Sequence, residues 1–342
     1  MKRILFLFLL QNFIVLKNYS QVFTVKDLLE LSAMPQKNID RFMIKKDFQL
    51  GYNQQEKDAV AMRYNFKTRS KKNHKDTERS IDMLLSDNLK YFTLRTSSLN
   101  EYLDGKRALV KEGFFYGFNK NVNKDSAILF QKKNISIEAT TQLKDSVKEY
   151  VFKLKEKKIP DSVVYAEDLL QFDSNEFLVS FFGEKNVKRD IYYFSKKELK
   201  KCSVLFSGTQ YQAVFIWGDE STLNNLSYVL ITDILPTEGG RQDVYVDENN
   251  KWKFKSGLRS GMTLRDLLRL NQMDFYIYGN KSDLAFMVTP KETGKINFKK
   301  TGIMLSCSNC YDDNIFEQPE VSALDIAKAN VPLRVFDIIL YP

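Results

Sequence analysis

The chain has 342 residues, 43% of them hydrophobic, and a formal net charge of +9 at pH 7. This composition is that of a globular protein and excludes a disordered chain. Three cysteines are too few for a scaffold built on disulfides, and a single histidine excludes Ser-His-Asp and Cys-His catalysis and histidine-rich zinc sites.

The first twenty residues have the layout of a secretory signal peptide. Residues 2–3 are basic, residues 4–16 are mostly apolar, and residues 17–20 are polar. We expect export with cleavage between Ser20 and Gln21, and a periplasmic or secreted protein. A retained membrane anchor or a buried N-terminal helix is the alternative. No later stretch has the eighteen or more apolar residues of a membrane span, so the mature chain is expected to have no transmembrane segment.

Charge is unevenly distributed along the mature chain. Residues 21–160 carry 28 Lys and Arg against 18 Asp and Glu, a net charge of +10, and residues 161–342 carry 21 against 25, a net charge of −4. The basic half could meet an anionic partner such as lipopolysaccharide or a teichoic-type polymer. The favoured interpretation is that lysines on solvated faces keep the protein in solution. Nucleic acid is not an expected partner, because lysine outnumbers arginine and the basic residues are scattered.

Pro160 is the best candidate for a domain boundary. It follows the charged run 153–158, and the sign of the net charge changes there. We therefore expect a signal peptide over residues 1–20, an N-terminal domain over 21–160 and a C-terminal domain over 161–342.

Helices are expected to open the first domain. Thr24 is placed to cap a helix, with Asp27 positioned to meet its dipole. The segment 35–48 has Ile39 and Met43 at helical spacing and predicts a second, short helix.

A third helix is predicted after the capping box formed by Ser98 and Glu101, and Gly113 is placed to end it. Its apolar side is expected to consist of Leu99, Tyr102, Leu103, Leu109 and Val110.

Strand-forming residues of this half concentrate at 59–66, 89–94, 114–118, 127–139 with a break near Lys132, and 148–155. The charged segment 67–79 predicts an exposed loop that contains His74, interpreted as a surface residue. Helices followed by antiparallel strands are typical of an α+β domain with short helices packed on one face of the sheet.

The second half has a similar pattern. A helical segment is expected at 166–182, a turn-rich and mobile loop at 236–250, and a further helix after Gly261. Strands are predicted at 190–194, 202–206, 212–217, 226–232 and 335–340. The whole chain is therefore predicted to be an α+β protein with two domains.

Cys307 and Cys310 form a close pair that could be a local disulfide in an oxidising compartment, while Cys202 stands alone. A thioredoxin-like redox pair is the alternative, but it would need a helix N-terminus after a strand. The acidic turn at 311–314 favours a structural disulfide.

A glycoside hydrolase needs two carboxylates and no histidine, so the composition does not exclude this class of enzyme. The acidic pairs nearest aromatic residues are Asp219-Glu220, which follows Trp217, and Asp312-Asp313. Adjacent acids on a strand point to opposite faces, so both pairs are interpreted as surface turns. Together with Asn314 the second pair could offer oxygens to calcium, but no EF-hand spacing supports that site. We therefore predict no catalytic residue, no metal site and no cofactor.

The segment 257–271 is the most motif-like of the chain, and every residue in it has a structural explanation: Gly261 for the turn, Thr263 for the cap, and leucines for the core. It resembles a group of uncharacterised exported proteins of Bacteroidota-type bacteria. They share the pattern Gly-(Leu/Ile)-x-x-Gly-Met-Thr-Leu-x-(Asp/Glu)-Leu-x-x-Leu-Asn. In this chain the pattern and the aromatic strand after it cover residues 257–279, and the segment 293–298 and the cysteine pair belong to the same resemblance. The resemblance implies the cellular compartment and the bacterial lineage of this protein, but it implies no activity.

The missing catalytic patterns and the abundant Phe and Tyr favour a non-enzymatic protein that binds an envelope or extracellular partner through an aromatic sheet face. The alternative is a carboxylate-dependent enzyme acting on envelope glycan. A cleft that brings Trp217, Tyr228 and paired acids together would favour the enzyme.

Overall fold

The structure is a computed structural model that describes residues 23–55, 58–69, 76–119, 127–144, 147–194, 198–232, 250–291, 294–307, 310 and 314–342. Residue contacts divide the chain into two units, Met1–Lys158 and Ile159–Pro342. Each unit is described by itself.

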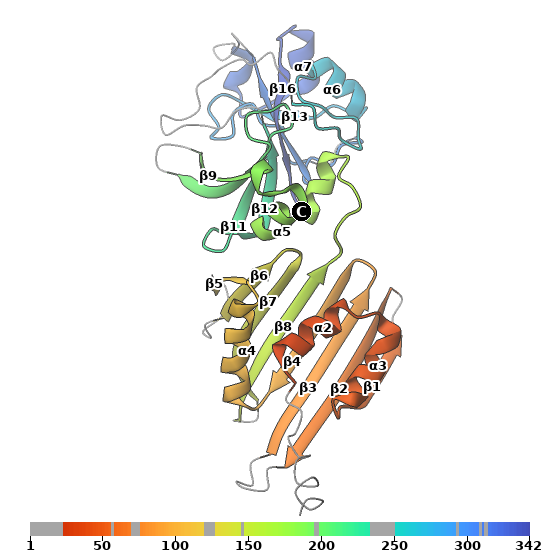
Figure 1. Cartoon of the computed structure of the whole chain (residues 1–342). Coiled ribbons are helices and arrows are strands. Elements are labelled where there is room, and N and C mark those ends of the chain that lie inside the picture. Colours follow the sequence, from red (N-terminus) through yellow and green to blue (C-terminus); the bar gives the residue numbers. More distant parts are fainter. Residues whose placement is uncertain are drawn as a thin grey trace, which may run out of the picture. The chain divides into compact units, whose positions relative to one another are not determined.

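The first unit is built on an eight-stranded sheet in the order β1-β2-β3-β4-β8-β7-β6-β5, and every neighbouring pair is antiparallel (Figure 1). Hairpins therefore join most neighbours. The strands are β1 (Gln49–Gln55), β2 (Ala59–Arg69), β3 (Asp76–Ser86), β4 (Leu89–Thr96), β5 (Phe115–Asn119), β6 (Ala127–Lys132), β7 (Ile135–Lys144) and β8 (Val147–Lys157).

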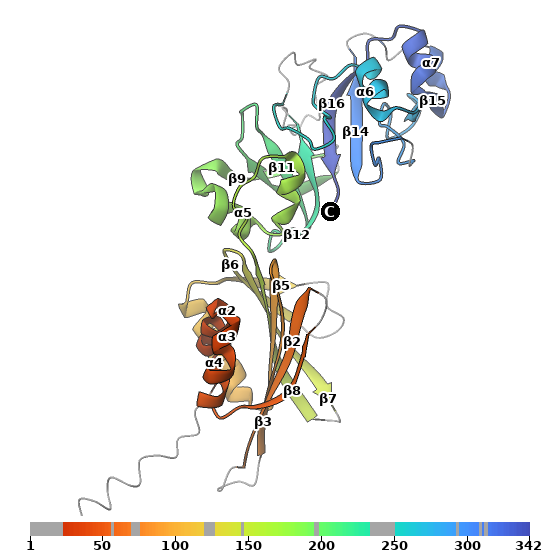
Figure 2. The same ribbon diagram turned by 90° about the vertical axis from the view of Figure 1, so that its right-hand side faces the viewer.

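Three helices lie on one face of this sheet, as Figure 2 shows: α2 (Val25–Ala33), α3 (Gln36–Lys45) and α4 (Leu99–Lys111). The side chains of Val60, Met62 and Tyr64 are buried at alternate positions of β2 and belong to the core of this unit. This alternation is the pattern of a sheet with one covered face. The predicted capping of α2 is confirmed, because Thr24 and Asp27 form a complete capping box.

The prediction of an exposed loop over residues 67–79 is wrong at both of its ends, residues 67–69 and 76–79. β2 continues to Arg69 and β3 begins at Asp76; residues 70–75, including His74, lie outside the described part of the chain. The charged residues of this segment were interpreted as a loop, but the side chains of β3 alternate between the core and the opposite face of the sheet. Ile81 and Met83 are buried, while Asp82 between them pairs with Arg63 on the opposite face.

The capping box predicted for α4 is only half formed. The backbone N–H of Glu101 donates to the hydroxyl of Ser98 (3.4 Å). The carboxylate of Glu101 does not return to Ser98; it accepts hydrogen bonds from Arg79 Nε (2.9 Å) and Thr96 Oγ1 (2.7 Å). The Glu101 carboxylate, which the local sequence pattern predicted to cap the helix, therefore forms a long-range ion pair with the buried Arg79 instead.

The buried side of α4 is also narrower than predicted. Gly105 lies against β8, where a Cβ atom would be 2.7 Å from the ring of Phe152. The helix therefore approaches the sheet most closely along one stripe, which consists of Tyr102, Gly105 and Leu109. The predicted core residues Leu99, Leu103 and Val110 are exposed beside this stripe.

The second unit contains a six-stranded sheet in the order β14-β16-β12-β11-β10-β9 and a small sheet of β13 and β15. The strands are β9 (Val187–Tyr193), β10 (Leu199–Leu205), β11 (Ala213–Asp219), β12 (Asn224–Ile231), β13 (Tyr276–Tyr278), β14 (Thr301–Ser306), β15 (Glu320–Ser322) and β16 (Arg334–Leu340). The helices are η1 (Ala166–Gln171), α5 (Asn175–Phe182), η2 (Glu184–Asn186), α6 (Leu264–Asn271), η3 (Asn314–Glu317) and α7 (Ala323–Lys328).

The α+β fold class is confirmed by these antiparallel sheets and short helices. The single helical segment predicted at 166–182 is two helices, because Ser174 interrupts it and caps α5 through the N–H of Phe177 (3.2 Å). Of the loop predicted at 236–250, only Asn250 lies within the described residues. None of the described helices has the length and apolar character that crossing a bilayer requires.

Candidate functional site

The second unit has an open pocket with a cavity volume of about 930 Å³. Four separate parts of the unit form it: the residue before η1, the turn between β10 and β11, the segment 250–261, and the start of β16. The lining residues are Tyr165, Gln210, Tyr211, Asn250, Lys251, Trp252, Lys253, Phe254, Gly257, Leu258, Arg259, Ser260, Gly261 and Arg334.

The side chains of the segment 251–254 alternate between the exposed rim of the pocket and the buried core beneath it. Lys251 and Lys253 are exposed, while Trp252 and Phe254 are buried in the hydrophobic core. The indole N–H of Trp252 donates to the carbonyl of Tyr211 (2.8 Å), which ties this segment to the β10–β11 turn. On the other side, the carbonyl of Lys253 accepts the N–H of Ala166 (2.8 Å). These bonds hold the cations of the rim on a rigid base.

The segment 257–261 forms another wall of the pocket. Gly257 and Gly261 have left-handed backbone angles, φ +86° and +74°, which favour glycine. The N–H of Gly261 donates to the carbonyl of Val335 (2.8 Å), so the wall is bonded to β16. The turn places Arg259 on the rim and Leu258 in the core. A segment that the sequence explained by folding alone therefore also shapes the pocket.

The rim is strongly basic. Its exposed cations are Lys251, Lys253, Arg259 and Arg334, and the lining drawn from the described residues includes no Asp or Glu. Arg334 donates to the carbonyl of Gly261 (3.3 Å), a neutral acceptor that does not cancel its charge. This cluster lies within a half of the chain whose net charge is −4. The unit thus concentrates positive charge at one concave place, where a positive potential attracts anions.

Two tyrosine side chains lie at the pocket with much of their surface exposed. Tyr165 is 38% exposed and Tyr211 is 48% exposed. The ring of Tyr211 meets that of Trp252 edge to face, with centroids 6.0 Å apart. The pocket therefore offers ring faces together with cations, a combination suited to an anion that carries a flat or cyclic group.

The structure does not bring together Trp217 and Tyr228, the two aromatic residues expected to line a glycan cleft. Trp217 is buried in the main core and its indole N–H donates to Ser203 Oγ (3.0 Å). Tyr228 pairs across the strands with Ile216, the neighbour of Trp217, and therefore lies on the other face of the sheet. The pair Asp312-Asp313 lies outside the described residues.

Asp219 and Glu220 serve a turn at the end of β11. Asp219 accepts from the backbone N–H and the hydroxyl of Ser221 (2.8 and 2.6 Å). Burial works to raise the pKa of Asp219, but these hydrogen bonds and those from Thr222 outweigh it and leave the pKa below its ordinary value. Glu220 accepts the backbone N–H of Lys201 (2.9 Å). A carboxylate with a lowered pKa is a poor general acid.

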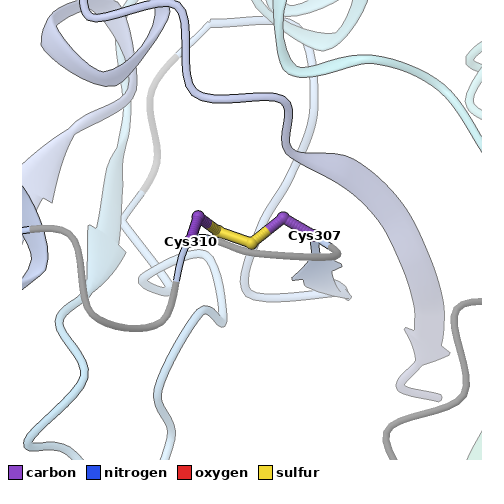
Figure 3. The surroundings of a disulfide bond; sticks show 2 residues. All are labelled: Cys307 and Cys310. Atoms are coloured by element: carbon purple, nitrogen blue, oxygen red, sulfur yellow. A yellow bond between two sulfur atoms is a disulfide. The ribbon is translucent and has the colours of Figure 1, made fainter.

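A disulfide joins Cys307 and Cys310, whose Cα atoms are 5.9 Å apart (Figure 3). Both residues are 4% exposed and belong to the hydrophobic core, and Cys307 directly follows β14. Cys202 is a buried free thiol, and burial raises its pKa to about 12. Thiol exchange needs an accessible sulfur with a low pKa, so these surroundings do not suit redox chemistry.

Within the described residues, no group of three or more His, Cys, Asp and Glu is placed to hold a metal ion. Comparisons with protein-family models, with curated proteins and with solved structures each find no match. The chemistry of the pocket is therefore the main guide to function.

The pocket was not predicted from the sequence, although the sequence contains one local signal for it. The run from Lys251 to Lys255 alternates cations with Trp252 and Phe254, the period of a strand with one buried face. Tyr165, Tyr211 and Arg334 are distant in the chain, and no local pattern connects them to this run.

Proposed function

We propose that this protein is an exported, non-enzymatic binding protein of the cell envelope or the extracellular space, and that the pocket of its second unit takes an anionic ligand with a cyclic group, such as an acidic glycan. The single observation that carries the proposal is the gathering of four exposed cations around one pocket in an acidic half of the chain.

Recognition would divide between the two kinds of lining residue. Arg259 and Arg334 offer planar guanidinium groups that can bind a carboxylate or phosphate through two parallel hydrogen bonds, and the lysines act as point charges. The exposed tyrosine rings can pack against a sugar or another ring. The described lining has no carboxylate, cysteine or histidine to move a proton or attack a bond, which favours binding over catalysis.

Binding is tested directly with an oligomer of galacturonic acid and the neutral galactose oligomer of the same length, by titration calorimetry. We expect the acidic oligomer to bind and the neutral one to bind at least tenfold more weakly. Replacing Arg259 with alanine should weaken binding of the acidic oligomer about tenfold, since a hydrogen bond to a charged group contributes roughly 1.5 kcal/mol or more. Binding should also weaken as salt rises.

The matched control is Arg269→Ala. It removes the same side chain and the same charge from the same unit, but Arg269 lies on α6, paired with Asp266 and outside the pocket lining. It should bind the acidic oligomer like the unchanged protein. Equal weakening by both variants would mean that net charge, and not the pocket, attracts the ligand. Equal binding of the acidic and neutral oligomers would contradict the proposal.

The export part of the proposal rests on the basic, apolar and polar segments of residues 1–20. N-terminal sequencing of protein from the envelope or medium should begin at Gln21 or within a few residues of it. Intact protein beginning at Met1 and recovered from the cytoplasm would contradict export and leave the pocket experiment unaffected.

A further inference from the structure

β1 is the edge strand at one end of the sheet in the first unit, and it pairs with β2 alone among the described strands. All seven of its residues are exposed. Its sequence, Gln-Leu-Gly-Tyr-Asn-Gln-Gln, contains neither a charge nor a proline. Proteins usually protect an edge with charged side chains, with proline or with covering chain, because an open edge can pair with another strand.

The two edges of the six-stranded sheet show such protection. β9 carries Lys188, Arg189 and Asp190 along its length. The outer side of β14 is covered by the segment 286–288, since the N–H of Val288 donates to the carbonyl of Ile303 (2.9 Å). Within the described part of the chain β1 has neither device, although a bulge at Gly51 interrupts the regular pairing near its start.

Apolar side chains flank the β1 edge on both faces of the sheet. Leu50 pairs with the buried Tyr64 and so lies on the helix face, where Ile44 of the neighbouring α3 is also exposed. Tyr52 lies on the other face and stacks on Arg63, with 5.4 Å between the guanidinium and the ring centroid. Leu50 and Tyr52 therefore give this edge exposed apolar surface, which pairing with another strand would bury.

We propose that β1 pairs with β1 of a second copy of this chain, antiparallel, about a two-fold axis normal to the sheet. We choose a second copy as the partner because the β1 strand is complementary to itself. The strand itself is uncharged, so the two paired strands bring no like charges of their own together, and their amide side chains both donate and accept hydrogen bonds. Centred on Asn53, the pairing sets Asn53 opposite itself and Tyr52 opposite Gln54, and leaves the bulge towards one end.

A two-fold pairing closes after two copies. It joins the two sheets into one continuous sheet with both helix layers on the same side. A single pair of short strands buries less than the roughly 1,200 Å² of a standard stable interface, so the dimer should be reversible and depend on concentration. This inference does not depend on the proposed ligand pocket.

Sedimentation velocity over a concentration series tests the pairing. We expect monomer at low concentration and dimer in the high micromolar range. Gln54→Lys should raise the dimer dissociation constant at least about tenfold, because it places a lysine beside Tyr52 and Arg63 of the other copy. Gln142→Lys is the matched control: it makes the same change at an exposed position of β7, an interior strand, and should leave the dimer unchanged.

The register is tested by Asn53→Cys under mild oxidation. We expect a covalent dimer, since residue 53 of each copy faces the other; the buried Cys202 and the bonded Cys307 and Cys310 do not compete. The variant Gln142→Cys should stay monomeric. Monomer at every concentration, or dimers equally weakened by both lysine variants, would overturn the proposal. Open-ended polymers would overturn it too, because they would indicate pairing of β1 with the opposite edge, β5.

Discussion

Replacing Gly294 with alanine is expected to lower the free energy of unfolding of the second unit by about 3 kcal/mol or more. Gly294 has a φ of +77°, where a residue with a Cβ atom is strained by roughly 1–2 kcal/mol. A Cβ there would also overlap the carbonyl oxygen of Asn271 and lie 2.6 Å from both polar atoms of its side chain. Overpacking of this kind costs a further 1–3 kcal/mol, roughly.

Asn271 cannot move aside to admit the methyl group. It is fully buried, and its side-chain amide donates to the carbonyl of Met273 (2.8 Å). Its side-chain oxygen accepts the N–H of Ile296 (3.0 Å), and its carbonyl accepts the N–H of Lys295 (2.9 Å). Any shift would leave buried polar groups without partners, which is expensive in free energy.

Chemical denaturation followed by tryptophan fluorescence measures the effect, and Gly208→Ala is the control. Gly208 has a similar backbone angle, φ +73°, but an added Cβ would meet nothing within 4 Å. We expect this control to lose only the roughly 1–2 kcal/mol of backbone strain. Equal losses in the two variants would show that overlap with Asn271 does not matter.

These contacts also give a structural reason for two motif-like segments. Asn271 ends the segment 257–271, and Gly294 to Ile296 lie in the second segment of the resemblance, residues 293–298. The side chain and carbonyl of Asn271 join the two. A fold requirement therefore accounts for these residues without any site.

The sequence predicted what local signals encode. The caps at Thr24 and Thr263 are both present, since each accepts the N–H of the aspartate three residues later (3.2 Å). Strands such as β2 and β4 were found because apolar and β-branched residues alternate there. These signals depend on neighbours a few residues apart, and so they survive without knowledge of the tertiary fold.

What the sequence did not predict depends on residues far apart. Arg79 was assigned to a solvated loop, yet it is buried on β3 and paired with Glu101 of α4. The same holds for the pocket, because Tyr165 and Arg334 reach it from separate elements. A charge that is neutralised by a distant partner cannot be distinguished from a solvated charge in the sequence alone.

The second large effect is expected at α6, where Leu267→Ala should lower the free energy of unfolding by about 2–5 kcal/mol. Leu267 is fully buried in the core of the second unit, so truncation removes its packing and leaves a cavity. Leu268 is only partly buried beside the core, and Leu268→Ala should cost less. Thr263→Ala should cost about 1 kcal/mol through loss of the helix cap.

Substitutions on the polar side of α6 are the comparison for these core and cap variants. Asp266 and Arg269 pair with each other at the surface, and an exposed ion pair of this kind contributes little to the free energy of unfolding. Arg269→Ala should therefore change stability by no more than about 0.5 kcal/mol. Asp266 also accepts a hydrogen bond from the hydroxyl of Thr263 (2.8 Å), so the stability lost in Asp266→Ala should lie between the losses in Arg269→Ala and Thr263→Ala.

Denaturation midpoints that rise in the order Leu267→Ala, Thr263→Ala, Arg269→Ala would indicate that the role of α6 is to cover the core. If instead Arg269→Ala left stability unchanged but abolished binding of the acidic oligomer, α6 would be a recognition surface and the pocket would not be the site.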